Sequence, residues 1–269
     1  MPGPADRATG AATGEGCQAP SAAQLAHQPR YGARHHIQYR GIQKRGESRL
    51  FWLKKSLSCP LDDNLPLSTP IQELSFTIFD TETTGFQVAT TDRLLEIGAV
   101  QMKGFEVLEK NTFQTYVKPN RDIPKLITEL TGITEEKVKG APESIEAITA
   151  YFDFIEKNKS AALVGHYVAF DEMVLRQEVR RAKQVMKKPK VIDTLNIIGF
   201  LSPSWEMRDL ERYAMAFGTR IYERHSAIGD ALTTAYLFSE LLQQFVDRGY
   251  KTWGDLIRYS DVESRTYSF

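Results

Sequence analysis

Residues 75–86 read SFTIFDTETTGF, and this stretch decides both the fold and the chemistry that we expect. Its apolar residues predict a β-strand, in which the side-chain period of two places Asp80 and Glu82 on the same side. Phe76 and Ile78 commit the strand to a hydrophobic core. Two neighbouring carboxylates repel each other, and one of them would normally take up a proton. A divalent cation such as Mg²⁺ or Mn²⁺ prefers oxygen ligands. A bound cation of this kind explains why both carboxylates lie at the end of an apolar strand.

Three further residues extend this pair into a candidate metal site. Asp171 follows a short apolar strand in ALVGHYVAFD and falls in the first turn of the next helix, while Asp230 falls in the first turns of a later helix within RHSAIGDA. Taken singly, such residues would be helix N-terminal acids favoured by the helix dipole. His225 precedes the later helix, on a loop that can reach across the site. We expect metal binding by four acids, with His225 as a base: Asp80, Glu82, Asp171 and Asp230.

The remaining pattern predicts an α/β fold, a mixed sheet with helices on both faces. Residues 74–82, 93–102 and 107–117 have strand patterns, and Gly104 turns the second into the third, which gives an antiparallel opening. Short buried strands follow at 161–166 and 190–193, alternating with helices as parallel strands do. Helical spacing is found at 123–131, 142–157, 169–183, 206–217, 226–245 and 253–259.

Composition divides the chain into three parts. Residues 1–70 are expected to form a basic, largely disordered extension and linker, because Gly, Ala, Pro and Gln recur at the start and three prolines follow. An apolar run from Leu50 to Leu57 could form a short docking helix within it. The main domain is expected at 71–247, and a short C-terminal helix and tail at 248–269.

The net charge is zero, with 34 Lys and Arg against 34 Asp and Glu, which excludes a histone-like binder held by overall charge. The sum hides a segregation, because the first 70 residues carry nine basic and five acidic residues. The basic run from Arg30 to Lys55 is a solvated arm or, alternatively, a phosphate-binding segment. Two cysteines argue against a disulfide scaffold and fit a cytoplasmic protein. No apolar run reaches the roughly 20 residues of a membrane span.

These residue types suit phosphoryl transfer. Four carboxylates can hold two cations, roughly 3.5–4 Å apart, which clamp the attacking and leaving oxygens of an in-line displacement. Histidine, which titrates near neutral pH, can take the proton of the attacking water. A phosphatase with an aspartyl nucleophile is a competing interpretation, but it usually requires Asp-x-Asp, whereas this chain has Asp80-x-Glu82.

Three motifs, in this order, resemble those of the DEDDh exonucleases of the ribonuclease H-like superfamily, in particular the proofreading epsilon subunit of bacterial replicative polymerases and its stand-alone relatives. The DTETTG run at 80–85 matches the first motif, GHYVAFD at 165–171 the second, and His225 with Asp230 the third. The resemblance covers about residues 72–246. Tyr167 departs from it, because the family commonly has Asn there, and this change bears on substrate preference rather than on the metal ligands.

The resemblance implies a metal-dependent 3′→5′ exonuclease that releases mononucleotides from single-stranded ends, with two Mg²⁺ or Mn²⁺ ions as cofactors. It leans toward DNA, in proofreading or repair, and RNA 3′-end trimming is the alternative. A non-catalytic, polymerase-associated binding module is a third interpretation, disfavoured because such proteins generally lose one of the acids. The expected partners are DNA or RNA 3′ ends and a DNA polymerase, and a stand-alone homodimer is an equal alternative. No membrane partner is expected.

Four other residues are candidates for substrate contact. Thr83 and Phe86 lie where relatives seat the terminal nucleotide, and Phe86 either stacks on a base or packs within its loop. Glu96 lies inside an apolar strand, where a carboxylate needs a partner: the substrate's terminal sugar or a backbone N–H. His166 ends a buried strand beside the site, where a structural role competes with substrate contact. Asp193 is expected to cap the following helix.

Overall fold

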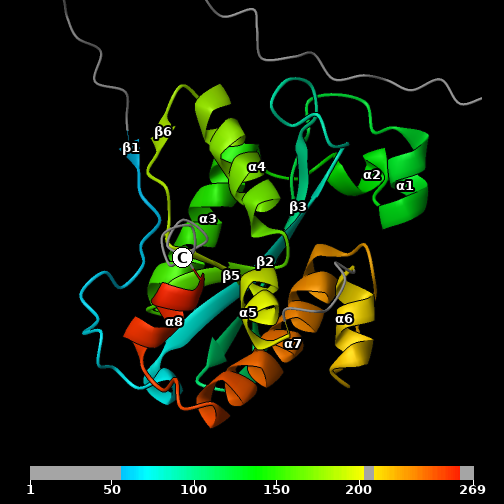
Figure 1. Ribbon diagram of the computed structural model, residues 1–269. Helices are drawn as coiled ribbons and strands as arrows, with labels where there is room; N and C mark the ends of the chain where they lie inside the picture. Colours follow the sequence, from blue (N-terminus) through cyan, green and yellow to red (C-terminus); the bar gives the residue numbers. More distant parts are fainter. Residues whose placement is uncertain (1–55, 203–208, 261–269) are drawn as a thin grey trace, which may run out of the picture. The chain divides into compact units, whose positions relative to one another are not determined.

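Strand β2 (Ser75–Thr83) lies at the centre of a five-stranded sheet in the computed structural model, which describes residues 56–202 and 209–260. The strand order is β4-β3-β2-β5-β7 (Figure 1). β2 pairs antiparallel with β3 and parallel with β5. The remaining pairs are antiparallel for β3 with β4 and parallel for β5 with β7, so the predicted mixed sheet is confirmed. The other strands are β3 (Leu94–Lys103), β4 (Glu106–Tyr116), β5 (Ala162–Gly165) and β7 (Val191–Asp193).

Helices cover both faces of this sheet, as predicted. Helix α7 (Ala227–Asp247) packs across β2, β3 and β4 on one face, whereas α3 (Ser144–Lys157) and α4 (Val168–Arg181) pack on the other (Figure 1). The remaining helices are α1 (Lys125–Thr131), α2 (Glu135–Val138), α5 (Thr194–Leu201), α6 (Leu210–Ala216), α8 (Trp253–Ser260) and the 3₁₀ turn η1 (Ile71–Glu73).

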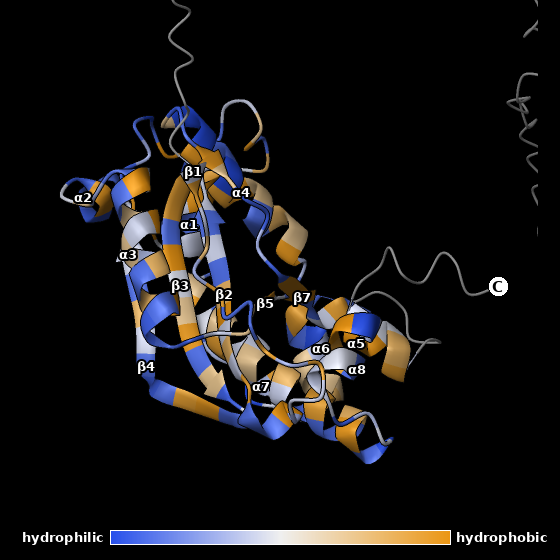
Figure 2. Ribbon diagram, turned by 90° about the vertical axis from the view of Figure 1, so that its left-hand side faces the viewer, coloured by the Kyte–Doolittle hydropathy of each residue, from blue (hydrophilic) through white to orange (hydrophobic). Residues whose placement is uncertain are grey.

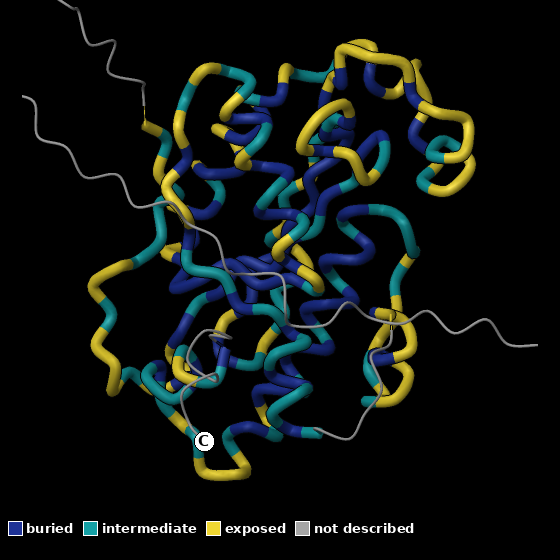
Figure 3. Tube along the Cα trace, turned by 45° about the horizontal axis from the view of Figure 1, so that its top comes forward, coloured by how far each residue is buried: buried dark blue, intermediate teal, exposed yellow. Residues whose placement is uncertain are grey.

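Two hydrophobic clusters fill the space between sheet and helices, because successive side chains of a strand point to opposite faces. Phe76 packs under α7, with its ring edge-on to Phe238 at 5.3 Å, whereas Phe79 packs against Tyr151 of α3. Figure 2 shows the hydrophobic stretches of β3. Figure 3 shows the buried strands in the middle and the exposed turns around them. The sheet is therefore a rigid base for whatever its strand ends carry.

The start of α7 lies directly against β3. Gly98 of β3 is the register partner of Asp80, and a Cβ atom at Gly98 would lie 2.2 Å from the backbone nitrogen of Ile228. Only a residue without a side chain allows the helix to begin this close to the strand. The carboxylate of Glu96 accepts the backbone N–H of Ala227 at 3.2 Å and so satisfies a donor at the helix start. These contacts bring the first turn of α7 beside the end of β2.

Some elements differ from the sequence-based expectation. Strands β1 (Ser56–Leu57) and β6 (Val185–Met186) form a parallel pair that was not expected, because two-residue strands show no periodicity. Leu57 therefore lies in a strand instead of the proposed docking helix, whose other residues lie outside the described ones. Helix α6 begins at Leu210, where Asp209 accepts the backbone N–H of Arg212. The expected start at 206 also falls outside the described residues.

The segment before η1 contacts the sheet domain, although we assigned it to a linker. Leu57, Cys59 and Leu61 pack against the cluster beneath α3 and α4, and Asp62 donates its backbone N–H to Ser160. Burial, aided by Asp63, raises the pKa of the Cys59 thiol to about 12.

Within residues 56–202 and 209–260, the helices lack the combination of length and apolar character that crossing a bilayer requires.

Candidate functional site

The four predicted acidic ligands meet at one cavity of about 550 Å³, although they come from three different elements. Asp80 and Glu82 belong to the end of β2, Asp171 to the first turn of α4 and Asp230 to the first turn of α7. His225, just before α7, lines the same cavity. Ligand atoms of Glu82, His225 and Asp230 lie within 4.8 Å of one another. The structure therefore brings together all five residues to which the motifs pointed.

Asp171 is held in place by its neighbour on β2. The backbone N–H and the hydroxyl of Thr81 both donate to Oδ1 of Asp171, at 3.0 and 2.6 Å. Because side chains alternate along the strand, Thr81 points away from the side taken by Asp80 and Glu82 and reaches the helix on the other face. The two bonds engage Oδ1, so a ligand can be bound through Oδ2.

Asp230 is held from the loop that precedes α7. Its Oδ1 pairs with the guanidinium of Arg224, and its Oδ2 accepts the backbone N–H of His225 at 3.2 Å. His225 has a positive φ of 59°, in the left-handed region that non-glycine residues seldom adopt. The turn at His225 and these bonds hold the loop against the start of α7. Among the described residues that line the cavity, Arg224 is the single Arg or Lys.

Burial and mutual repulsion raise the pKa of these carboxyl groups. The pKa of Asp80 lies well above its usual range because of burial and then the charges of Asp171, Asp230 and Glu82. Burial, followed by Asp230 and Glu96, raises the pKa of Glu82 to about 8. The pKa of Asp171 rises to about 7 through burial, against the bonds from Thr81. The four carboxyl groups outnumber the one guanidinium of Arg224 beside them, and their oxygen donors fit hard divalent cations.

Apolar side chains line the same cavity as the carboxylates and form what we call its apolar wall. Phe86 is 82% exposed, and its ring lies 6.0 Å from that of Phe170. Leu126 and Leu130 of α1 are 72% and 47% exposed and line the same cavity. The apolar residues are grouped beside polar ones, as at ligand-binding surfaces. Thr83 also lines the cavity, and its hydroxyl donates to the carbonyl of Gly85 at 2.7 Å.

The other candidate residues fall into two groups. His166 lines the cavity, and its Nδ1 lies 2.7 Å from the hydroxyl of Thr194. Glu96 is 2% exposed, is bonded to the Ala227 backbone and to Gln114, and does not line the cavity. Of its two expected partners, the structure therefore shows the backbone N–H.

Asp193 caps α5, as expected, by accepting the backbone N–H of Leu195 at 3.0 Å. It also accepts the backbone N–H groups of Tyr167 and Val168, at 3.2 and 3.1 Å. One carboxylate therefore anchors both the start of α5 and the turn that leads into α4, the helix that carries Asp171.

Sequence reasoning missed several residues of the cavity. Arg224 directly precedes the His225 motif, so its position alone could have drawn attention to it. Thr81 lies between the two motif acids, where the period of two predicts the opposite side and gives no hint of a bond to Asp171. Leu126 and Leu130 are four residues apart on a short helix, a spacing typical of an apolar stripe, here without a core to cover.

Comparison with known proteins gives a consistent picture. Residues 77–238 match the RNase_T family model, which describes exonucleases. The chain is 31% identical over 224 residues to the PolC-type DNA polymerase III of Bacillus subtilis (strain 168), covering 81% of this chain and 15% of that protein. It is 34% identical over 191 residues to a DNA polymerase III subunit epsilon-like protein of Rhodobacter capsulatus, covering 70% of this chain and 27% of that one. The chain thus corresponds to a minor part of each relative.

Solved structures share the fold. The nuclease domain of 3′hExo, a DEDDh family member bound to rAMP, has a TM-score of 0.55 at 19% identity, covering 63% of this chain and 92% of that one. Exonuclease X in complex with 5′ overhanging duplex DNA has a TM-score of 0.51 at 20% identity, covering 69% and 99%. These similarities identify the mixed sheet with its helices as the ribonuclease H-like fold.

Proposed function

This chain belongs to the exonuclease family whose model it matches, enzymes that cut phosphodiester bonds, and on that premise we propose that it is a 3′→5′ exonuclease. We propose single-stranded DNA ends as its substrate, mononucleotides as its product and proofreading or repair as its role. The observation that carries the proposal is the meeting of four carboxylates and His225 at a cavity with an apolar wall. The phosphate of a bound nucleotide would lie at the carboxylates, and its base would lie at the apolar wall.

The acidic residues are assigned to cation binding. Asp80, Glu82, Asp171 and Asp230 would hold two divalent cations, Mg²⁺ or Mn²⁺, because hard cations prefer carboxylate oxygens and because these buried acids repel one another without them. Bound cations would stabilise the charge that develops on the attacking and leaving oxygens. Thr81 orients Asp171, and the His225 backbone orients Asp230.

The other side chains are assigned to proton transfer and to positioning. His225 would take a proton from the attacking water, because its ring lies beside Glu82 and Asp230 on a loop that faces the cavity. Phe86 would stack on a terminal base, since an aromatic ring stacks on any base, and Leu126 and Leu130 would pack against the terminal bases as apolar surface. With its terminal bases held by these side chains, the strand would place its scissile phosphate next to the carboxylates.

RNA 3′-end trimming is the second candidate. It is favoured by the structural neighbour bound to rAMP, whereas the polymerase III relatives favour DNA. The same relatives suggest a DNA polymerase as partner, and gel filtration of the chain with and without a polymerase catalytic subunit tests that association. Gel filtration of the chain alone tests the homodimer.

The decisive experiment uses DNA and RNA oligonucleotides of one sequence, labelled at the 5′ end and incubated with Mg²⁺. We expect a ladder of products that shorten from the 3′ end, with faster loss of DNA. Products cut from the 5′ end would contradict the proposed direction, and faster loss of RNA would favour the second candidate. Absence of hydrolysis with Mg²⁺ and with Mn²⁺ would contradict the function itself.

His225→Ala tests the base. We expect a rate about 10²- to 10⁴-fold lower, as for loss of other positioned general bases, while Mn²⁺ binding measured by calorimetry stays close to that of the wild type. Unchanged activity at neutral pH would remove His225 from the mechanism.

A further inference from the structure

A cluster of basic side chains occupies the second half of α4 and the segment after it, outside the catalytic cavity. Residues 176–190 contain seven basic residues against Glu178 alone. Arg181 is bonded to Glu178, and Lys190 is paired with Asp63 at 3.6 Å. The other five, which we call the basic strip, are Arg176, Arg180, Lys183, Lys187 and Lys188.

The basic strip is exposed and has few acidic partners. Arg176 reaches Glu172 at 3.8 Å, with 49% of its side chain exposed. Within the described part of the chain, the other four make no ion pair. Residues 71–269 as a whole carry an excess of acidic residues, so the strip is a local reversal of charge. Neighbouring like charges destabilise one another unless an anion lies between them.

The strip is connected to the catalytic cavity at the start of α4. A second cavity of about 440 Å³ is lined by Val168, Ala169 and Lys188, and also by the acids Glu172 and Asp193. Tyr167, one residue earlier, lines the catalytic cavity and is 43% exposed. Asp193 accepts the backbone N–H groups of both Tyr167 and Val168, so one anchored turn separates the two cavities. Beyond it, Arg176 and Arg180 lie on the second half of α4, and Lys183, Lys187 and Lys188 lie on the segment that follows the helix.

From this arrangement we propose that the basic strip binds the phosphates of the substrate strand on the 5′ side of the nucleotides held in the catalytic cavity. The proposal rests on the proposed function and adds a second binding surface to it. The strand would leave the catalytic cavity over Tyr167, whose exposed ring offers a base a surface on which to stack. It would then follow α4, where Lys and Arg neutralise its phosphates. Binding would therefore increase with strand length.

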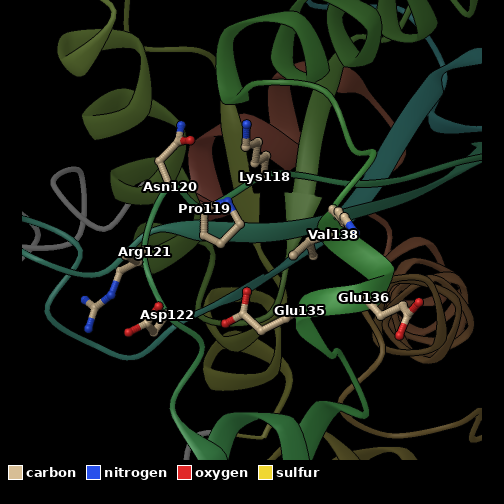
Figure 4. Close-up of a pocket in the computed structure, with 9 residues that line it drawn as sticks. Lys118, Pro119, Asn120, Arg121, Asp122, Glu135, Glu136 and Val138 are labelled. Carbon is tan, nitrogen blue, oxygen red and sulfur yellow. The ribbon is translucent and has the colours of Figure 1, made fainter.

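A third cavity does not offer an equivalent surface. It has a volume of about 740 Å³, and Figure 4 shows that acidic and basic side chains of two segments surround it. Arg121 is already bonded to Asp92 and to the carbonyl of Thr91, and Glu135 accepts the backbone N–H of Ile123. Its charges are thus of both signs and partly engaged, which makes it a poor site for a polyanion.

The test compares two full-length variants that lose the same charge. One neutralises the four residues of the strip that make no ion pair: Arg180→Gln, Lys183→Gln, Lys187→Gln and Lys188→Gln. The control neutralises four exposed lysines near the opposite end of the sheet: Lys103→Gln, Lys110→Gln, Lys157→Gln and Lys159→Gln. Affinity for a trinucleotide and for a DNA strand of about 15 nucleotides is measured with EDTA present, so that no cleavage occurs, at several salt concentrations.

We expect the strip variant to bind the long strand about tenfold or more weakly and to lose about 3 from the slope of log affinity against log salt. Its affinity for the trinucleotide and its rate on the trinucleotide with Mg²⁺ should stay within a factor of two or so of the wild type. The control should bind both as the wild type does.

Equal losses in the two variants, or an equal loss for the short and the long strand, would overturn the proposal. Unchanged binding of the long strand by the strip variant would also overturn the proposal. Because affinity is measured without metal ions, an enzyme that fails to cut would contradict the proposed function and leave this comparison standing.

Discussion

Strand β2 carries one row of side chains on the α7 side, and the two halves of that row have opposite chemistry. Phe76 and Ile78 are fully buried under α7. Asp80 and Glu82 continue the same row at the same spacing but line the acidic cavity. The backbone is the same regular strand in both halves. What differs is the cover: the body of the helix lies over the first half, and the second half extends beyond the start of the helix.

The comparison shows how an acidic site can be built without cost to the core. A buried carboxylate needs a partner, and the row places its carboxylates only beyond the part of the strand that the body of α7 covers. The position at which the helix starts, set by Gly98 and by the Glu96 carboxylate, therefore divides stability from chemistry. Substitutions in the two halves should separate these properties.

Asp80→Asn should have the largest effect, on the uncovered half. We expect activity to fall by at least about a thousandfold, because cation binding contributes several kcal/mol of charge stabilisation. The melting temperature in EDTA should stay unchanged or rise, since the change removes a buried charge from the cluster. Product formation with Mg²⁺ and circular dichroism on heating measure the two. A well-folded variant with normal turnover would contradict the metal site.

Phe76→Ala should do the reverse in the covered half. Removal of this buried ring, which packs edge-on against Phe238, should lower the free energy of unfolding by about 3–5 kcal/mol. Activity per folded molecule should remain within a few-fold of the wild type, because the ring does not line the cavity. Urea unfolding gives the first quantity, and initial rates corrected for the folded fraction give the second. A large loss of activity in the folded fraction would show that the two halves of the row are not independent.

Gly98→Ala tests the boundary between the halves. The added methyl group would lie 2.2 Å from the Ile228 nitrogen and 2.3 Å from the Ala227 carbonyl carbon, so the helix start must move. We expect a loss of about 1–3 kcal/mol in stability and of about tenfold to a hundredfold in rate. Gly140→Ala is the control, because a Cβ there has nothing within 4 Å. If both variants behave alike, the close approach at Gly98 is not what positions Asp230.

The pH dependence of the metal-free protein should show the smallest effect. Glu82 and Asp171, with pKa values of about 8 and 7, keep protons in the folded chain that they release in the unfolded chain. Stability in EDTA should therefore fall as pH rises from about 5 to 8. Mg²⁺ should raise the melting temperature more at pH 8 than at pH 6, because it binds the ionised form. A melting temperature that does not depend on pH in EDTA would show that burial and repulsion do not raise the pKa of Glu82 and Asp171 as described.

Much of this could be predicted from the sequence. Strand and helix periodicity predicted the five strands of the sheet and the long helices to within a few residues. The acids of the three motifs and His225 were predicted to meet, and in the structure they line one cavity. Periodicity works here because each element is long enough to repeat its pattern and each has one buried face.

The rest depends on contacts between distant segments. The Arg224–Asp230 pair depends on the turn at His225, and the Glu96 bond to Ala227 joins residues 131 positions apart. In the sequence, nothing distinguishes Gly98 from other strand residues, because its role depends on the contact with the start of α7. β1 and β6 are too short to show a period. Such features become visible only when the packing of the elements is known.

The site takes its fourth acid from a helix that the ribosome makes late. More than half of the chain separates Asp80 on β2 from Asp230 on α7, and domains fold as their last essential segment emerges. A nascent chain without α7 would have the first acidic pair but neither Asp230 nor the His225 loop. We therefore expect newly made chains to remain harmless to nucleic acid throughout synthesis of the sheet. Their cutting activity should arise in one step, when the final layer docks.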